Sequence, residues 1–571
     1  MNTGADAHTG APPNSRSSLK FPDFSTVVAI GIALMICLPL LAVIKLALFP
    51  TENIWPHLFR TVLPHYLFNT LVLMAGVAAG TLLIGVSTAW LVTHYDFTGR
   101  RIFVWALLLP FAVPAYVIAF VYTELLEFSG PLQSLLRSIF GWESATDYYF
   151  PKIRTLGGAT LMMVLVLYPY VYLLARSAFL EQSASLLEAA RVLGQPRRRS
   201  FFAISLPLAR PAIVVGVAMA LMETLNDFGT VDYFAVQTLT AGVFDIWQNM
   251  GNLSGGAQIA CLLLLFVFLL LLIERFGRKH QKQFQPSASR FRQFHRTRAT
   301  GWHNVLLFLC CAIPVLLGFI IPIMILLEYS IRYFDESWTE EFRQTATNSL
   351  LLSATAAVIA VGLGILLAYS NRIKKNKLLQ ACTRLASTSY ALPGAVLAIG
   401  IMIPFATIDN TIDSFMRAQF GISTGLILSG TVFALLFAYV VRFLAVAFGS
   451  VESSLAKITP SMDMAARSLG QKPSKMLWTV HIPLMKSGIL TALLVVFVDC
   501  MKELPATLLL RPFNFDTLAT HVYQLASDEL IEQSALAALL IVLTGLIPVI
   551  LLSLTLDRSR SSTSRKVIQE P

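Results

Sequence analysis

The sequence is poor in charge. Of its 571 residues only 13% are Asp, Glu, Lys or Arg, whereas 56% are hydrophobic and the mean hydropathy is +0.68. A soluble protein of this length needs far more polar surface, so the soluble classes are excluded. Uncharged runs such as 68–93 are long enough to cross a membrane core of about 30 Å as helices. These runs lack the strict alternation of barrel strands, so we expect an all-α integral membrane protein.

Cysteines are also few, and their spacing matches no known pairing pattern. All six lie in or beside apolar segments, and the sequence contains no C-x-x-C motif. They are typical of small packing residues, which excludes a disulfide framework and a cysteine metal site. The nine histidines are scattered without ligand spacing, so we expect no tightly bound metal ion.

Hydropathy predicts about twelve membrane spans between two polar tails, 1–23 and 557–571. The predicted spans are 24–48, 68–94, 102–123, 157–181, 211–226, 257–273, 304–329, 347–370, 385–407, 424–447, 487–501 and 534–556.

The net charge of +11 would favour nucleic-acid binding in a soluble chain. Here, however, Lys and Arg gather in the tails and in alternate connections between spans, while Asp and Glu dominate the other connections. The positive-inside rule therefore predicts that both termini are cytoplasmic, and no nucleic-acid partner is expected. The acidic outer face suits a cationic cargo, although ordinary solvated loops have the same composition.

The second half of the sequence repeats the first. The segment 188–194 is echoed 276 positions later by 464–470, and earlier in the chain an offset of 279 pairs Asn69 with Asn348. Since each copy holds six spans, an even number, both copies cross the membrane in the same direction. The predicted divisions are a first repeat at 24–273 (core 68–273), a basic cytoplasmic linker at 274–303 that would meet anionic lipid headgroups, and a second repeat at 304–556 (core 347–556).

The repeated segment lies in the cytoplasmic loop after the fourth span of each copy. It predicts short helices at Ser185–Val192 and Asp463–Leu469, which end before Gly194 and Gly470. Glycine ends a helix at low cost, and the proline that follows prevents the helix from restarting. The chain would thus present the same short helix to the cytoplasm twice.

This loop resembles the cytoplasmic coupling loop of permease subunits in binding-protein-dependent ABC importers. In that family the loop helix docks on the ATP-binding subunit, which implies two copies of that subunit and a periplasmic binding protein as partners. The second copy has Met464 where the first has Glu188, with Asp463 one position earlier, so its docking contact would be built differently. The docking residues implied by the resemblance are Glu188, Ala189, Ala190, Gly194, Pro207, Ala465, Ala466, Gly470 and Pro483.

The sequence contains no G-x-x-x-x-G-K-[ST] loop that could hold the phosphates of a nucleotide. ATP and Mg²⁺ would therefore be bound by the partner ATPase. We expect this chain to be a transport subunit with no cofactor and no enzymatic activity of its own.

Acidic residues at membrane depth are the candidates for contact with cargo. Each predicted fifth span, 211–226 or 487–501, carries a carboxylate near its end, and a second carboxylate follows four residues later. Four residues are about one helical turn, so we expect each pair to lie on one stripe. The pseudo-twofold relation of the repeats would bring both pairs to one path for a hard cation, which prefers oxygen ligands. The candidate path residues are Glu223, Asp227, Asp499 and Glu503.

A purely structural role for these acids is equally open. Glu223 and Asp499 would then be held by hydrogen bonds between helices, while Lys502 and Arg511 would neutralise the second pair.

Arginines and prolines mark other unusual points in the spans. Arg176 and Arg442 lie near the cytoplasmic ends of the fourth spans, and we expect their side chains to extend to the membrane surface; a role in the path is the less favoured alternative. Pro110, Pro114 and Pro393 are expected to interrupt the third spans, either as a kink near a gate or as a packing irregularity.

The segments 223–230 and 502–516 resemble the single-chain ferric-iron permeases, in which two permease units are fused. The resemblance implies a translocation subunit in the bacterial inner membrane that takes Fe³⁺ from a ferric-binding periplasmic protein by alternating access. Fused permeases for thiamine or another small solute share this architecture and remain an alternative. A secondary transporter driven by an ion gradient is the alternative from another class, and it would not need duplicated cytoplasmic helices.

Overall fold

The computed structural model describes residues 24–50, 54–182, 192–281, 296–374 and 376–567. Within these ranges the regular structure is helical, apart from two strands of two residues each. Eleven helices of the described chain are long and apolar enough to cross a membrane, and one bent pair raises the number to twelve. The predicted all-α class and the expected number of spans are confirmed.

The elements of the first repeat are α1 (Phe24–Leu48), α2 (Trp55–Arg60), α3 (Leu63–His94), β1 (Tyr95–Asp96), α4 (Arg100–Ala106), η1 (Leu109–Ala112), α5 (Ala115–Leu126), α6 (Pro131–Phe140), α7 (Leu156–Glu181), α9 (Arg197–Ser200), η2 (Phe201–Ser205), α10 (Leu206–Asn226), α11 (Gly229–Tyr233), α12 (Leu239–Phe244), η3 (Asp245–Asn249) and α13 (Leu253–Gln281).

After β2 (Thr297–Arg298), the elements of the second repeat are α14 (Trp302–Val315), η5 (Leu316–Ile320), α15 (Ile321–Arg332), α16 (Phe334–Ser337), α17 (Glu340–Ile373), α18 (Lys377–Ala386), η6 (Ser389–Ala391), α19 (Gly394–Phe420), α20 (Val432–Leu455), α21 (Pro460–Ser468), α22 (Pro473–Met476), η7 (Leu477–His481), α23 (Ile482–Met501), α24 (Pro505–Leu510), α25 (Leu518–Ser527) and α26 (Ile531–Val567).

The third span of each repeat is interrupted at a proline. In the first repeat the axis bends by 91° between α4 with η1 and α5 with α6. Pro114 stands at the break with extended backbone, because proline lacks the N–H that a continuous helix requires. Pro393 occupies the same place before α19. The interruptions predicted within 102–123 and 385–407 are therefore confirmed.

Matched hydrogen bonds support the duplication. The side-chain amide of Asn69 donates to the backbone carbonyl of Gln237 at 2.9 Å. Asn348, 279 positions later, donates to the carbonyl of Asp516 at 3.3 Å. Threonine side chains also cap the first turns of α7 and α20, 276 positions apart. The two repeats therefore share local geometry as well as sequence.

The first span of each repeat packs against the other repeat. α1 lies along α19, and a Cβ atom on Gly400 would come within 2.4 Å of the Pro39 carbonyl oxygen, so the two backbones touch. In the other direction, the hydroxyl of Tyr122 on α5 donates to the carbonyl of Leu317 on η5 at 2.7 Å. The repeats are therefore interlocked, and neither is a separate domain.

The fifth spans are longer than predicted. Each continues from a π-helical turn, so that the apolar helices run over Phe201–Asn226 and Pro473–Met501. The predicted starts of 211–226 and 487–501 are wrong, because Pro207 and Pro483 lie in the first turns of α10 and α23, where proline is tolerated. Both ends agree with the prediction.

The predicted flexible linker, 274–303, has regular structure at both ends. α13 continues to Gln281, and β2 pairs in parallel with β1 through Tyr95 opposite Thr297. Residues 282–295 lie outside the described chain.

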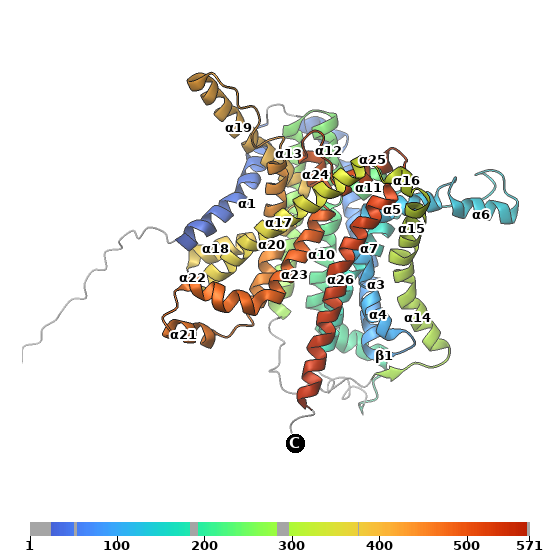
Figure 1. Cartoon of the computed structure of the whole chain (residues 1–571). Helices are drawn as coiled ribbons and strands as arrows, with labels where there is room; N and C mark the ends of the chain where they lie inside the picture. The colour runs from blue at the N-terminus through green and yellow to red at the C-terminus, as the bar shows by residue number, and fades with distance from the viewer. Residues whose placement is uncertain (1–23, 51–53, 183–191, 282–295, 375, 568–571) are drawn as a thin grey trace, which may run out of the picture.

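The connections gather at two ends of the helical bundle (Figure 1). α21, β1 and the C-terminal end of α26 lie at the lower end of the view, while α6, α12, α16 and α25 lie at the upper end. The predicted topology would make the lower end cytoplasmic.

Candidate functional site

A pocket of about 110 Å³ lies where the two repeats meet. Its walls come from α7 and α10 of the first repeat, from α20 and α23 of the second, and from the turns that follow α10 and α23. The structure brings all four predicted path carboxylates into this lining. The charged, amide and tyrosine side chains of the lining are Tyr116, Tyr170, Glu223, Asn226, Asp227, Tyr390, Arg442, Asp499, Lys502 and Glu503.

The acids of each pair do not share a helical stripe. Glu223 and Asp499 lie in the last turns of α10 and α23, but these helices end before Asp227 and Glu503. The predicted stripe is therefore wrong, because the backbone leaves the helix between the two members of each pair.

The second acid of each pair caps the short helix that follows. Asp227 accepts hydrogen bonds from the backbone N–H and the hydroxyl of Thr230, at 2.9 and 3.0 Å. Glu503 accepts the backbone N–H of Ala506 at 3.0 Å. Free N–H groups at the start of a helix favour a carboxylate, so α11 and α24 fix these acids beside the pocket.

Both acids of the second repeat have a cationic partner. Glu503 pairs with Arg442, and both side chains are at most 5% exposed. Asp499 pairs with Lys502 at 3.3 Å. Burying such charges is tolerable only when they are paired, so these ion pairs hold the second repeat's side of the pocket together. The neutralising role predicted for Lys502 is confirmed.

The other predictions about arginines are wrong. Arg511 pairs with Asp516, outside the pocket lining, and so does not neutralise the acidic pair. Arg176 and Arg442 are 5% and 4% exposed, so neither extends to a surface. Arg442 does not need to reach the membrane surface, because the carboxylate of Glu503 neutralises its charge inside the protein.

The acids of the first repeat have no such compensation. At an offset of 276, the positions aligned with Lys502 and Arg442 are Asn226 and Val166. Within the described part of the chain, neither Glu223 nor Asp227 forms an ion pair. The pocket is therefore neutralised on the side of the second repeat and left acidic on the side of the first.

Tyrosines from both repeats surround the uncompensated side. Tyr390 of η6 and Tyr170 of α7 both donate hydrogen bonds to Glu223, the latter at 3.5 Å. Tyr116 also lines the pocket, is 4% exposed, and has a hydroxyl without a hydrogen-bond partner among the described residues. Sequence reasoning missed these tyrosines, because an isolated tyrosine in an apolar span is ordinary and only the fold brings them together.

The two repeats also touch through backbone at the pocket. The N–H of Gly394 donates to the side-chain oxygen of Asn226 at 2.9 Å. A Cβ atom on Gly394 would come within 2.7 Å of Glu503 and 2.8 Å of Arg442. Only glycine allows the start of α19 to approach the ion pair so closely.

The second loop helix is α21. It starts at Pro460, three residues before the predicted start, because proline suits a first helical turn. Gly470 has φ +73°, and its N–H donates to the carbonyl of Arg467 at 2.9 Å, which ends the helix as predicted. Of the implied docking alanines, Ala465 is exposed and Ala466 is buried.

The first loop is described only in part. Gly194 again has φ +73°, which matches Gly470. Pro207 and Pro483 are each the second residue of a pocket helix, α10 or α23. The predicted helix Ser185–Val192 lies almost wholly outside the described residues, as do the docking residues Glu188, Ala189 and Ala190.

The chain matches a protein family once in each repeat. The family of the binding-protein-dependent transport system inner membrane component matches residues 81–279 and 360–562, which together make up more than half of the chain. The chain belongs to this family. Like other such permeases, it is a multi-pass inner membrane protein whose system includes a periplasmic binding protein and an ATP-binding subunit. ATP hydrolysis belongs to that separate subunit, and the permease is not itself an enzyme.

The permease is similar to several curated proteins. It is 26% identical to the Fe(3+)-transport system permease protein FbpB 2 of Haemophilus influenzae, over 93% of this chain and 98% of that one. It is 22% identical to the ferric transport system permease protein FbpB of Actinobacillus pleuropneumoniae, over 71% of this chain and 58% of that one. Over 33% of its length it is 28% identical to the molybdenum transport system permease protein ModB of Escherichia coli.

Proposed function

We propose that this permease is the translocation subunit of an ATP-driven importer that moves Fe³⁺ from a periplasmic binding protein to the cytoplasm. The observation that carries the proposal is the pocket between the repeats, where oxygen donors outnumber cations. Four carboxylates and three tyrosines line it, against one arginine and one lysine. Hard cations prefer oxygen ligands, and a relative that matches 93% of the chain is named for Fe(3+) transport.

The same pocket disfavours an anionic cargo. Partial relatives are named for molybdenum and for sulfate transport. An anion such as sulfate would meet the uncompensated Glu223 and Asp227, and the Coulomb repulsion would be strong away from bulk water. The cationic groups that could offset it, Arg442 and Lys502, are already bound to carboxylates.

Glu223 and Asp227 are the residues that we assign to the passing ion. The acids of the second repeat are occupied by Arg442 and Lys502, so an ion would have to displace a cation to bind them. Among the described residues, the side-chain hydrogen bonds to Glu223 come from tyrosine hydroxyls, which are neutral. A contact of this kind is weak enough to release the ion, as conduction requires.

Each cytoplasmic loop is joined directly to a pocket helix. The loop that contains Gly194 leads through η2 into α10, which carries Glu223, and α21 leads through η7 into α23, which carries Asp499. In the proposed mechanism two ATP-binding subunits dock on these loops from the cytoplasm, where both termini also lie. Their closure on ATP rocks one repeat against the other and opens the pocket to each side in turn.

The test is transport by the reconstituted system. Proteoliposomes that contain the permease with its ATP-binding subunit, supplied with the ferric-loaded binding protein, should accumulate radiolabelled Fe³⁺ only when ATP is present. Accumulation of thiamine but not Fe³⁺ would favour the small-solute alternative. Transport by the permease alone, driven by an ion gradient, would contradict the ATP-driven mechanism.

A further inference from the structure

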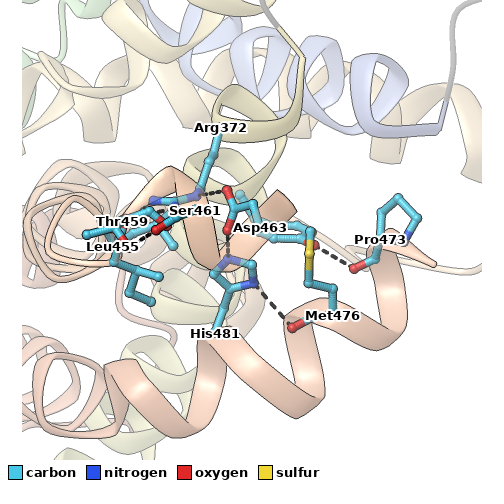
Figure 2. A network of polar contacts seen from close by, with 10 residues as sticks. Arg372, Leu455, Thr459, Ser461, Asp463, Pro473, Met476 and His481 are labelled. Atoms are coloured by element: carbon cyan, nitrogen blue, oxygen red, sulfur yellow. Dashed lines mark hydrogen bonds and ion pairs between the residues drawn. The ribbon is translucent and has the colours of Figure 1, made fainter. Parts of the chain in front are cut away.

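A polar cluster lies behind the second loop helix (Figure 2). Asp463 on α21 sits between Arg372, near the end of α17, and His481, the last residue of η7. Arg372 Nε donates to Asp463 Oδ2 at 2.8 Å, and His481 Nε2 lies 2.9 Å from Oδ1. The His481 side chain is fully buried, and the other two are 15% and 16% exposed. One carboxylate thus joins three separate helical segments.

Arg372 also binds the end of a fourth segment. Its terminal nitrogens donate to the carbonyls of Leu455 and Ile458, at 2.7 and 2.8 Å. Leu455 is the last residue of α20, and its carbonyl also accepts the N–H of Ile458, which lies just beyond the helix, at 3.1 Å. Carbonyls at a helix C-terminus lack partners within the helix, and the negative end of the helix dipole favours a cation there. The guanidinium therefore ties α17 and α20 to α21.

The His481 ring has an oxygen acceptor beside each of its two nitrogens. Nδ1 lies 3.2 Å from the carbonyl of Met476, and Nε2 faces Asp463. A backbone carbonyl and an ionised carboxylate can only accept, so both contacts are hydrogen bonds only when both ring nitrogens carry hydrogen. Partial burial opposes the charge of Asp463, but hydrogen bonds from Arg372 and His481 outweigh it and hold the pKa of this carboxyl below its usual value.

The first repeat cannot build this cluster. The positions aligned with Arg372, Asp463 and His481 are Thr93, Leu187 and Ser205. The Thr93 hydroxyl donates to Ala89 on its own helix at 2.7 Å. The Ser205 hydroxyl is buried without a hydrogen-bond partner among the described residues, and Leu187, whose structure is not described, has no polar side chain.

We propose that Arg372, Asp463 and His481 are positioning residues that make α21 move as one body with α17, α20 and α23. This inference rests on the proposed docking of an ATP-binding subunit on α21. α23 runs from the cluster to Asp499 at the pocket. A displacement of α21 by the ATP-binding subunit therefore moves the pocket end of α23 directly and is not absorbed by a flexible loop. The first repeat has Thr93, Leu187 and Ser205 at the aligned positions, and these side chains cannot form the same ion pairs. The two loops therefore transmit the movement of the ATPase with different stiffness, and the stiff one belongs to the repeat whose acids are neutralised.

The test uses the complete reconstituted complex with the Fe³⁺-loaded binding protein. The variants are Asp463→Asn and His481→Gln, and the matched controls are Thr93→Val and Ser205→Ala at aligned positions of the first repeat. We expect Asp463→Asn to assemble and to hydrolyse ATP, but to move several-fold less Fe³⁺ per ATP. Hydrogen exchange at α21 should rise about tenfold, the change expected for the loss of one charge-assisted hydrogen bond. The controls should change neither quantity.

Non-additivity identifies the cluster as a unit. The double variant Asp463→Asn with His481→Gln should move as much Fe³⁺ per ATP as the more severe of the two single variants. If Asp463→Asn does not assemble, Arg372→Lys should lower the amount of Fe³⁺ moved per ATP in the same way. Lysine keeps the positive charge but lacks the planar guanidinium that binds Asp463 and the end of α20 together. An unchanged amount of Fe³⁺ per ATP together with unchanged exchange at α21 would overturn the inference. Absence of Fe³⁺ uptake by the unaltered complex would instead contradict the proposed function, and exchange at α21 would still test the cluster.

Discussion

Arg442 and Glu503 form a buried ion pair beside the pocket between the repeats, and the position aligned with Arg442 in the first repeat is Val166. This difference, together with Asn226 at the position aligned with Lys502, separates the two sides of the pocket. A cation compensates the carboxylate that caps α24, whereas Asp227, which caps α11, has no cationic partner among the described residues. The duplicated halves thus keep the same fold and differ in charge where they meet.

Removing one partner of this pair should be costly. We expect Glu503→Gln to destabilise the permease by about 3 kcal/mol, because it leaves the Arg442 charge buried without a partner. The double variant Glu503→Gln with Arg442→Met should recover most of the loss, since it removes both charges and keeps the side-chain volume. Thermal unfolding of the purified permease measures both effects. An equal loss of stability in the single and double variants would show that the unpaired Arg442 charge is not the cause of the destabilisation.

Gly394 should not tolerate a side chain. In Gly394→Ala the new Cβ would come within 2.7 Å of Glu503 and 2.8 Å of Arg442, so the ion pair or the start of α19 must shift. We expect a loss of about 2 kcal/mol, typical of overpacking. Gly362→Ala is the matched control, because a Cβ there meets nothing within 4 Å and alanine favours the helix. Similar thermal unfolding of the two variants would contradict this account.

Gly470 should be required because of its left-handed backbone conformation, and not because a side chain would clash with its neighbours. A Cβ on Gly470 meets nothing within 4 Å, but its φ of +73° costs a side-chain-bearing residue about 1 kcal/mol. We expect Gly470→Ala to reorient the end of α21 and to weaken binding of the ATP-binding subunit about fivefold. Gly449→Ala, inside α20 and equally open, serves as the control. Co-purification at graded concentrations measures the affinities, and unchanged binding in Gly470→Ala would argue against docking on α21.

The sequence was sufficient to predict the elements whose causes are local. Uncharged runs predicted the spans, Gly470 predicted the end of the loop helix, and Pro114 and Pro393 predicted the breaks in the third spans. The repeat offset further predicted that carboxylates from both halves would meet, because related segments occupy related places.

What escaped prediction depends on contacts between distant segments. Arg442 was expected at the membrane surface, because its partner Glu503 lies in the distant turn between α23 and α24, and sequence periodicity carries no record of that pairing. The tyrosines around Glu223 come from α7 and η6, and nothing in their own neighbourhoods distinguishes them from ordinary packing residues. The interlocking of the first spans depends likewise on the whole fold.

The most direct test of the account is the initial rate of radiolabelled Fe³⁺ uptake in two matched variants. Glu223→Gln removes one of the two uncompensated charges. Asp499→Asn with Lys502→Gln removes a compensated pair and leaves the net charge of the pocket unchanged. We expect uptake to fall about tenfold in Glu223→Gln and to stay within about twofold of the unaltered rate in the paired variant, with both complexes assembled. Unchanged uptake in Glu223→Gln would contradict the assignment of the acidic side of the pocket to the passing ion.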